Sequence, residues 1–197
     1  YDPHVWTSPK QAKIQVDNIV NTLSQASPQA KDAFTAAGKK YTDQLEDLDK
    51  WASDSMSAVP EQDRVLFSSH DAFGYFSNEY GVKFIGSALS DFNHQQDATS
   101  SHIDEQVKKV RESGAKAIFA ENSNNSKSIE AIARAAGVKA VTSDDALYGD
   151  SLGVPGSEGE TYIGSIVHNI NTLVSAWDSK QQPLPESLQE FDFAKRK

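Results

Sequence analysis

The first part of the chain carries the hydrophobic spacing of two amphipathic helices. Ser8-Pro9 is a good helix start, with serine as the cap and proline at the first helical position. Apolar positions between residues 14 and 23 continue that helix to about Ser24. Ser27-Pro28 repeats the start signal, and apolar residues then recur every three or four positions to a helix end near Met56. This second helix would span roughly 40 Å at 1.5 Å per residue, a length that suits a strut between two lobes.

After Pro60 the pattern changes to short apolar runs that alternate with helical segments. Glycines at positions 81, 114 and 137 close three of the helical segments, and a last helix is predicted from about Glu160 to Trp177. The tail after Pro183 is predicted to be irregular. Strands that alternate with helices indicate right-handed crossovers, so we predict an α/β fold with a four-stranded parallel sheet flanked by helices. The four predicted strands are Val65–Phe67, Val82–Ile85, Ala117–Ala120 and Val138–Val141.

Polar, metal-capable residues follow these strands. His70 and Glu121 come just after the first and third strands, and Asp150 lies in the long loop of residues 142–159 after the fourth. Ligands of open α/β sheets bind outside the carboxyl ends of the strands, so these residues should converge. Imidazole and carboxylate groups are ligands for borderline divalent metals, and His4 adds another candidate. We expect Glu121 to orient a ligand rather than to bind the metal.

Each of these residues also has an ordinary structural interpretation. His70 could cap the helix that follows it, Asp150 could be a turn aspartate, and His4 could be exposed near a terminus. The remaining histidines are His102 and His168, which lie on predicted helices, and His94, which lies in a polar loop and stays open as a candidate.

Composition narrows the class of protein. With 197 residues and a hydrophobic fraction of 38%, the chain can form one substantial domain with attachments. Its net charge of -9 argues against a nucleic-acid partner, which would need a basic face. The absence of cysteine excludes disulfides and a thiolate zinc site. There is no Walker loop, GxGxxG, GxSxG or HExxH motif, and no apolar run long enough for a membrane span.

Four motifs together resemble the zinc- and manganese-binding solute-binding proteins of bacterial ABC importers, a family once labelled adhesins. Each motif is modest alone, but they occur in the family's order over nearly the whole chain. They are Asp2-Pro3-His4-Val5-Trp6, similar to DPHxW; Ser69 to Phe76, similar to HDAFGYF; Phe119-Ala120-Glu121, similar to FxE; and Asp150-Ser151-Leu152-Gly153 with Thr161-Tyr162 and Asn169, similar to DSLG…TY…N.

The resemblance implies two α/β lobes joined by one rigid helix, with the metal held between the lobes. The family's ligands carry over to His4, His70 and Asp150, with Glu121 behind them. Residues 1–27 would be a remnant of the first lobe, residues 28–58 the linking helix, and residues 61–197 the metal-binding lobe. The remaining family ligand, a histidine of the first lobe, has no counterpart in this sequence. We therefore interpret the chain as a processed or truncated piece that binds metal weakly by itself.

The function implied by the resemblance is extracytoplasmic capture of a divalent metal and its delivery to an ABC permease, with the protein anchored to the membrane. A histidine-rich set with one carboxylate favours Zn²⁺, and Mn²⁺ is the alternative. We therefore expect a binding protein and not an enzyme. A metal-dependent hydrolase with Glu121 as general base and a surface adhesin are the less favoured alternatives.

Overall fold

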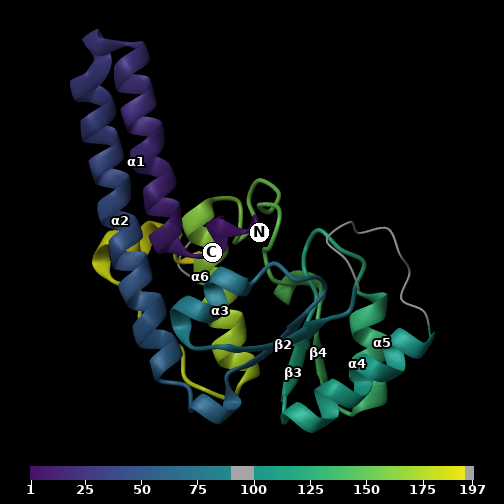
Figure 1. Cartoon of the computed structure of the whole chain (residues 1–197). Coiled ribbons are helices and arrows are strands. Elements are labelled where there is room, and N and C mark those ends of the chain that lie inside the picture. Colours follow the sequence, from purple (N-terminus) through teal and green to yellow (C-terminus); the bar gives the residue numbers. More distant parts are fainter. Residues whose placement is uncertain (90–99, 194–197) are drawn as a thin grey trace.

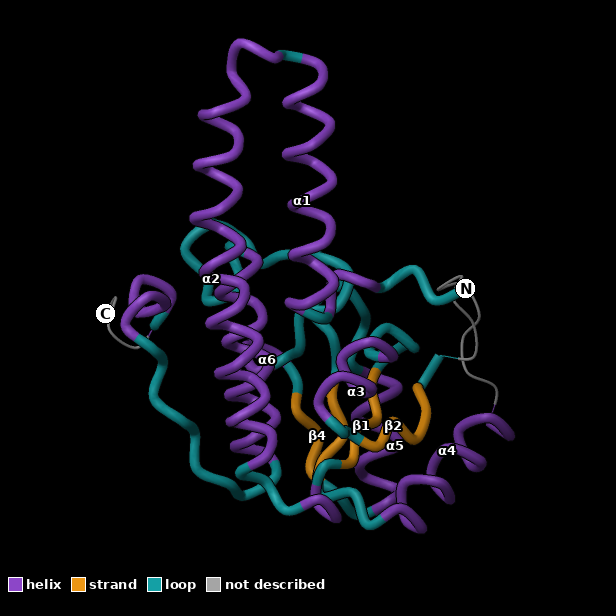
Figure 2. Tube along the Cα trace, turned by 60° about the vertical axis from the view of Figure 1, so that its left-hand side comes forward, coloured by secondary structure: helices purple, strands orange, loops and turns teal. Residues whose placement is uncertain are grey.

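A computed structural model describes residues 1–89 and 100–193, and it begins with two helices that stand side by side. Helix α1 (Pro9–Ala26) and helix α2 (Lys31–Ser57) form an antiparallel hairpin closed by a 3₁₀ turn at Pro28–Ala30 (Figures 1 and 2). Both helices were predicted. Helix α1 begins as expected, because Ser8 Oγ accepts a hydrogen bond from the backbone of Gln11 and Pro9 is the first helical residue.

The two halves of helix α2 pack against different neighbours. Its second half buries Leu45, Leu48 and Met56 in the main core, where the helix packs against helix α6 (Tyr162–Ala176). Its first half packs mainly on α1, and the hairpin tip projects away from the rest of the protein (Figure 1). The α1 side chains Ile19 and Leu23 remain exposed there.

All four predicted strands are present and pair in parallel. Strand β1 (Val65–Ser68) pairs with β2 (Lys83–Ser87), and β3 (Ala117–Phe119) pairs with β4 (Lys139–Val141). The α/β class is therefore confirmed. The predicted continuous sheet is instead two hydrogen-bonded pairs, with β1 lying against β3 (Figure 1). Side chains rather than a backbone ladder connect these two central strands at their carboxyl ends, as described below.

The strands divide the interior into two cores because successive side chains point to opposite faces. Leu66 and Phe119 pack with α2, α6 and helix α3 (Gly74–Tyr80). Phe67 and Ile118 pack with helix α4 (Ser100–Ser113) and helix α5 (Lys127–Ala136) on the other face. The glycines after α3 and α5 adopt left-handed backbone angles, which explains why both helices end where the sequence predicted.

The chain after Pro183 differs from its prediction. It was expected to be irregular, but Glu186–Phe191 forms a 3₁₀ helix that packs on α2 and buries Leu188 completely. The isolated Leu188 gave no periodic signal, which is why the sequence did not reveal this contact. The proposed division into residues 1–27, 28–58 and 61–197 stays a prediction.

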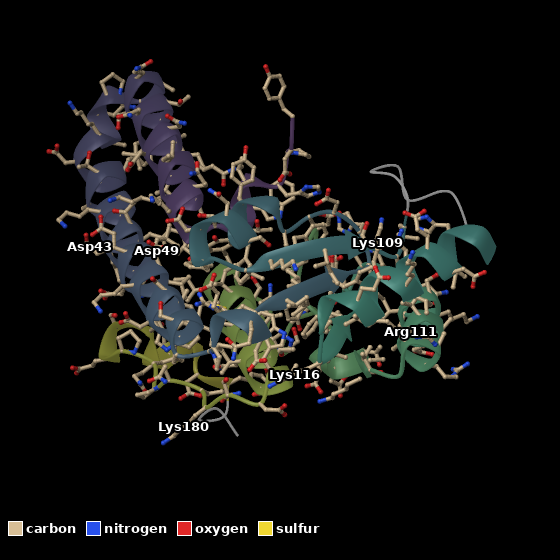
Figure 3. The ribbon with its side chains drawn as sticks, turned by 60° about the horizontal axis from the view of Figure 1, so that its bottom comes forward. Asp43, Asp49, Lys109, Arg111, Lys116 and Lys180 are labelled. Carbon is tan, nitrogen blue, oxygen red and sulfur yellow. The ribbon has the colours of Figure 1, made fainter. Side chains whose placement is uncertain are left out.

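Charged side chains cover the outer faces of the helices, as Asp43 on α2 and Lys109 and Arg111 on α4 illustrate (Figure 3). Lys116 pairs with Asp63 and Asp178, so it ties the segment before β3 to the end of α6. Across residues 1–89 and 100–193, we find no helix with the length and apolar character required to cross a membrane.

Candidate metal centre

His70 is fixed at the carboxyl end of β1 by the carboxylate of Glu121, at the end of β3. Glu121 Oε2 lies 2.7 Å from His70 Nδ1, and Oε1 accepts a hydrogen bond of 3.0 Å from the His70 backbone. The backbone of Glu121 in turn donates to Ser69 Oγ at 3.1 Å. Both carboxylate oxygens therefore engage one histidine, and the ring is oriented with Nε2 pointing away from Glu121.

Asp150 reaches the same place from the loop after β4. Its Oδ2 lies 3.0 Å from His70 Nε2, and its Oδ1 lies 3.5 Å from His4 Nε2. The side chain is 26% exposed, whereas those of both histidines are buried. The three residues thus meet at a place that stays open to solvent only on the aspartate side.

His4 is held in the same manner as His70. Its Nδ1 lies 2.8 Å from Asp2 Oδ1, which also accepts a 2.9 Å hydrogen bond from the His4 backbone. The two imidazole rings are 5.3 Å apart at an interplanar angle of 73°. Nearby, Trp6 Nε1 donates to the carbonyl of Gly149 at 2.8 Å, which docks the N-terminal segment on the Asp150 loop. The start of the chain is therefore an ordered wall of the centre.

His4, His70 and Asp150 each offer one ligand atom, and these atoms lie within 4.8 Å of one another. Within residues 1–89 and 100–193 this is the single such group of three or more metal-capable side chains. Each histidine has a carboxylate on Nδ1 and turns Nε2 inward. Carboxylate–histidine pairs of this kind fix the tautomer and the ring orientation of metal ligands in proteins.

Two opposing effects set the charge of His70. Burial lowers its pKa, but the hydrogen bond and negative charge of Glu121, assisted by Asp150, outweigh burial and raise the pKa above its ordinary value. A cation is thus favoured at this position. A metal ion at this position would have to compete with a proton for the imidazole ring.

Gly149 lets the Asp150 loop come this close. A Cβ atom at position 149 would lie 2.3 Å from Glu121 Oε2 and 3.7 Å from His70 Cε1. This close approach is the reason that a residue without a side chain is needed at position 149.

Several contributors to the centre carried no sequence signal of their own. Asp2 and Trp6 were visible only as letters of a motif, and their contacts with His4 and Gly149 could not be read from spacing. His102 and His168 lie on helices α4 and α6, as predicted, and His168 is buried against Ala146 O and Glu158. His94 lies outside the described residues.

The fold and the site define a class of protein, and comparison with known families identifies it. The family described as "Zinc-uptake complex component A periplasmic" matches residues 1–176. The chain therefore belongs to this family, as the four sequence motifs predicted.

Two relatives show how the chain compares with known members. It is 40% identical over 178 residues to the manganese-binding lipoprotein MntA of Bacillus subtilis, covering 89% of this chain and 58% of MntA. It is 32% identical over 178 residues to the zinc-binding protein TroA of Treponema pallidum, covering 89% of this chain and 57% of TroA. The chain thus spans a little over half the length of these relatives.

Solved structures show the same fold. The periplasmic zinc-binding protein TroA from Treponema pallidum superposes with a TM-score of 0.80 and 30% identity, covering 91% of this chain and 65% of that one. A metal-binding protein from Candidatus Liberibacter asiaticus, at 22% identity, shares the fold with a TM-score of 0.76.

Proposed function

We propose that this chain is the metal-holding part of an extracytoplasmic solute-binding protein that captures a divalent cation and delivers it to an ABC permease. The observation that carries the proposal is the convergence of His4, His70 and Asp150, with each imidazole backed by a carboxylate. The relatives' names support it, because they describe metal-binding lipoproteins and periplasmic proteins. An extracytoplasmic location with a membrane anchor is part of the same proposal.

The ligand atoms in this proposal are Nε2 of His4, Nε2 of His70 and one carboxylate oxygen of Asp150. Zinc bonds of about 2.0–2.2 Å place tetrahedral ligand atoms roughly 3.4 Å apart. Asp150 Oδ2 lies 3.0 Å from His70 Nε2 and Asp150 Oδ1 lies 3.5 Å from His4 Nε2, so each histidine has an aspartate oxygen at about that separation. Three protein ligands leave a fourth position for water or another donor.

Zinc is the cargo that this donor set favours. Two imidazoles and one carboxylate suit Zn²⁺, and the intrinsic affinity of nitrogen-rich sites is higher for zinc than for manganese. Manganese is the second candidate, because MntA is named as a manganese-binding protein.

A hydrolytic role for Glu121 does not suit its surroundings. A general base needs a free lone pair within reach of a water molecule. Both oxygens of Glu121 face His70, and the side chain is fully buried. Glu121 is therefore placed to orient His70, and we propose a binding protein rather than an enzyme.

Calorimetric titration of the chelator-stripped 197-residue chain tests the proposal. Zn²⁺ should bind at one site, and His70→Ala and Asp150→Ala should each weaken it by at least about 100-fold, since each removes a ligand. Asp144→Ala is the matched control, because this exposed aspartate lies in the same loop outside the ligand group. Equal zinc affinity in the wild type and in both ligand variants would refute the assignment. A parallel Mn²⁺ titration compares the two cargoes, and a higher affinity for Mn²⁺ would overturn the preference for zinc.

A further inference from the structure

The Asp150 loop is long, but the backbone just before Asp150 is held by a side chain of α6. Asn169 Nδ2 donates to the carbonyl of Tyr148 at 2.8 Å, and Asn169 Oδ1 accepts from the backbone N–H of Tyr148 at 2.8 Å. A neighbouring strand would make the same two bonds to one residue. The amide of Asn169, which is buried, therefore acts as a strand partner for Tyr148.

The backbone of Leu147, the residue before Tyr148, is held by the segment at the end of β3. The N–H of Leu147 donates to Ala120 O at 2.9 Å, and Leu147 O accepts from the N–H of Asn122 at 2.9 Å. The Asn122 side chain then reaches past Asp150 and donates to Ser151 O at 3.2 Å and to Ser151 Oγ at 2.9 Å. Asp150 thus stands between two residues whose backbones are fixed by asparagine side chains.

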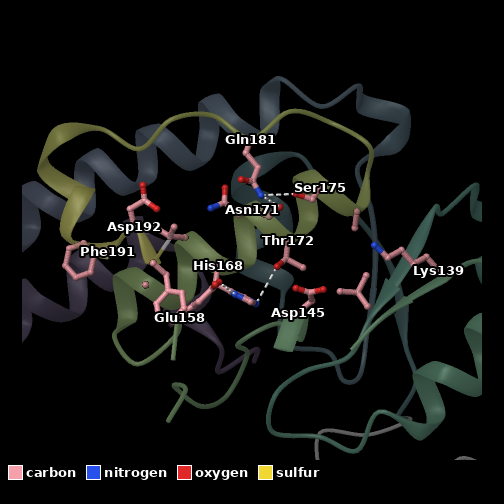
Figure 4. A pocket seen from close by; sticks show the side chains of 15 residues that line it. Lys139, Asp145, Glu158, His168, Asn171, Thr172, Ser175, Gln181, Phe191 and Asp192 are labelled. Carbon is pink, nitrogen blue, oxygen red and sulfur yellow. Dashed lines mark hydrogen bonds and ion pairs between the residues drawn. The ribbon is translucent and has the colours of Figure 1, made fainter. Parts of the chain in front are cut away.

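His168, which precedes Asn169, closes the ends of the same loop. Its Nε2 lies 3.0 Å from Ala146 O, and its Nδ1 lies 2.8 Å from Glu158 Oε2. His168 and Glu158 both line a cavity of about 350 Å³. Their side chains lie together in Figure 4. The His168 ring also contacts the ring of Tyr148, with 4.9 Å between centroids.

Cavities beside the loop show that hydrogen bonds, and not packing alone, hold its backbone in place. One of about 370 Å³ is lined by Trp6, Tyr148 and Leu152, and another of about 600 Å³ is lined by Tyr148, Ser151 and Val154. Apolar packing therefore covers only part of this segment. Polar contacts from Asn169 and Asn122, together with the Trp6 hydrogen bond to the Gly149 carbonyl, restrain the backbone that carries Asp150.

We propose that Asn169 and Asn122 are positioning residues for the Asp150 carboxylate, acting through the backbones of Tyr148 and Ser151. The inference rests on the proposed function, because it assumes that Asp150 is a metal ligand. A ligand oxygen has to sit within about 0.5 Å of its productive position. The backbones on either side of Asp150 are the points from which its side chain is aimed.

Asn169→Asp is the sharpest perturbation, because it keeps the size of the side chain. One carboxylate oxygen still accepts from the Tyr148 N–H, but the other faces the Tyr148 carbonyl, where an acceptor meets an acceptor. Asn122→Ala is a second, independent variant at an exposed side chain. Ser175→Ala is the matched control on α6, since Ser175 bonds Gln181 and not the loop.

The readouts are the Zn²⁺ dissociation constant by calorimetry, the visible absorption spectrum of the Co²⁺-loaded chain, and thermal unfolding without metal. We expect Asn169→Asp and Asn122→Ala to raise the dissociation constant by about 10-fold or more and to change the Co²⁺ spectrum. Ser175→Ala should leave the dissociation constant and the spectrum unchanged. A purely structural role would lower the unfolding temperature alone.

Asp150→Ala, measured beside these variants, separates the two proposals. If Asp150→Ala loses zinc while a folded Asn169→Asp binds as tightly as the wild type, the positioning role is overturned and the proposed function stands. If Asp150→Ala binds zinc like the wild type, the proposed function fails and the inference fails with it. If Asn169→Asp does not unfold cooperatively, Asn122→Ala decides: weaker binding supports the inference, and unchanged binding overturns it.

Discussion

Replacing Gly149 by alanine tests the geometry of the centre with a single methyl group. The added Cβ would lie 2.3 Å from Glu121 Oε2 and 3.3 Å from Glu121 Cδ. The carboxylate cannot simply swing away into solvent, because it is buried and both oxygens contact His70. The substitution therefore acts on the contact between Glu121 and His70, although it changes neither residue.

The size of the effect follows from these distances. An ordinary contact between the methyl group and the oxygen requires Oε2 to move by about 1 Å. Such a movement would break the 2.7 Å contact with His70 Nδ1. Overpacking costs about 1–3 kcal/mol, and a hydrogen bond to a charged group contributes about 1.5–3 kcal/mol. We expect the free energy of unfolding of the metal-free chain to fall by about 2.5–6 kcal/mol, the sum of these two contributions.

Urea unfolding of four proteins measures this effect: the wild type, Gly149→Ala, Glu121→Ala and the double variant. Without the Glu121 carboxylate, the methyl group at position 149 has room. The double variant should therefore lose less stability than the sum of the single variants, by at least about 1 kcal/mol. Zinc titration of Gly149→Ala should show an affinity lower by about 10- to 100-fold, because His70 loses its orienting partner.

Two results would refute this reasoning. If Gly149→Ala unfolds at the same urea concentration as the wild type and binds zinc equally well, Glu121 does not occupy the described position. If the losses of the two single variants add in the double variant, the methyl group acts somewhere other than on the carboxylate.

Four further predictions concern pH and single contacts. With His70 as a ligand, as proposed, a metal ion has to bind its neutral imidazole, and the pKa of that imidazole is raised. The zinc dissociation constant by calorimetry should therefore rise as pH falls from about 8 to 6, and a flat profile would contradict this. In the metal-free chain, the stabilisation from protonated His70 should be full below pH of about 6.5 and lost as pH rises through the raised pKa, as urea unfolding can measure. Asp2→Ala frees the Nδ1 side of His4 and should weaken zinc binding by about 10-fold in the same titration, whereas unchanged affinity would remove Asp2 from the site. Thr161→Ala removes the cap of α6 and should lower the free energy of unfolding by about 1 kcal/mol in urea, and a loss below about 0.3 kcal/mol would show that this cap contributes little.

Much of the fold could be predicted because its signals are local. Helix α1 begins at a serine–proline pair, and α3 and α5 end at glycines with left-handed backbone angles. The four strands were found as short apolar runs between turn signals. The missing backbone ladder between β1 and β3 could not be predicted, since the apolar runs mark the strands but do not show which strands are hydrogen-bonded to each other.

The candidate site also has a part that the sequence predicted and a part that it did not. His70 and Asp150 were placed near each other by a general rule about strand ends, and the structure brings them to 3.0 Å, although their role as metal ligands stays a prediction. The contacts of Trp6 with Gly149 and of Asn169 with Tyr148 join residues far apart in the chain. Contacts of that kind leave no periodic pattern, so only three-dimensional packing reveals them.

Glu121 both links β1 to β3 and orients the His70 ring. In a continuous sheet the carboxyl ends of β1 and β3 would be joined by a backbone ladder, which fixes strands but leaves side chains free to choose rotamers. Here Glu121 joins the ends instead, through its own backbone to Ser69 and through its carboxylate to the His70 backbone and ring. The same carboxylate therefore holds two strands together and aims an imidazole. Any change that moves Glu121 should accordingly alter stability and metal affinity together, whereas changes at Asn122, on the solvent side of the loop, should alter metal affinity with little effect on stability.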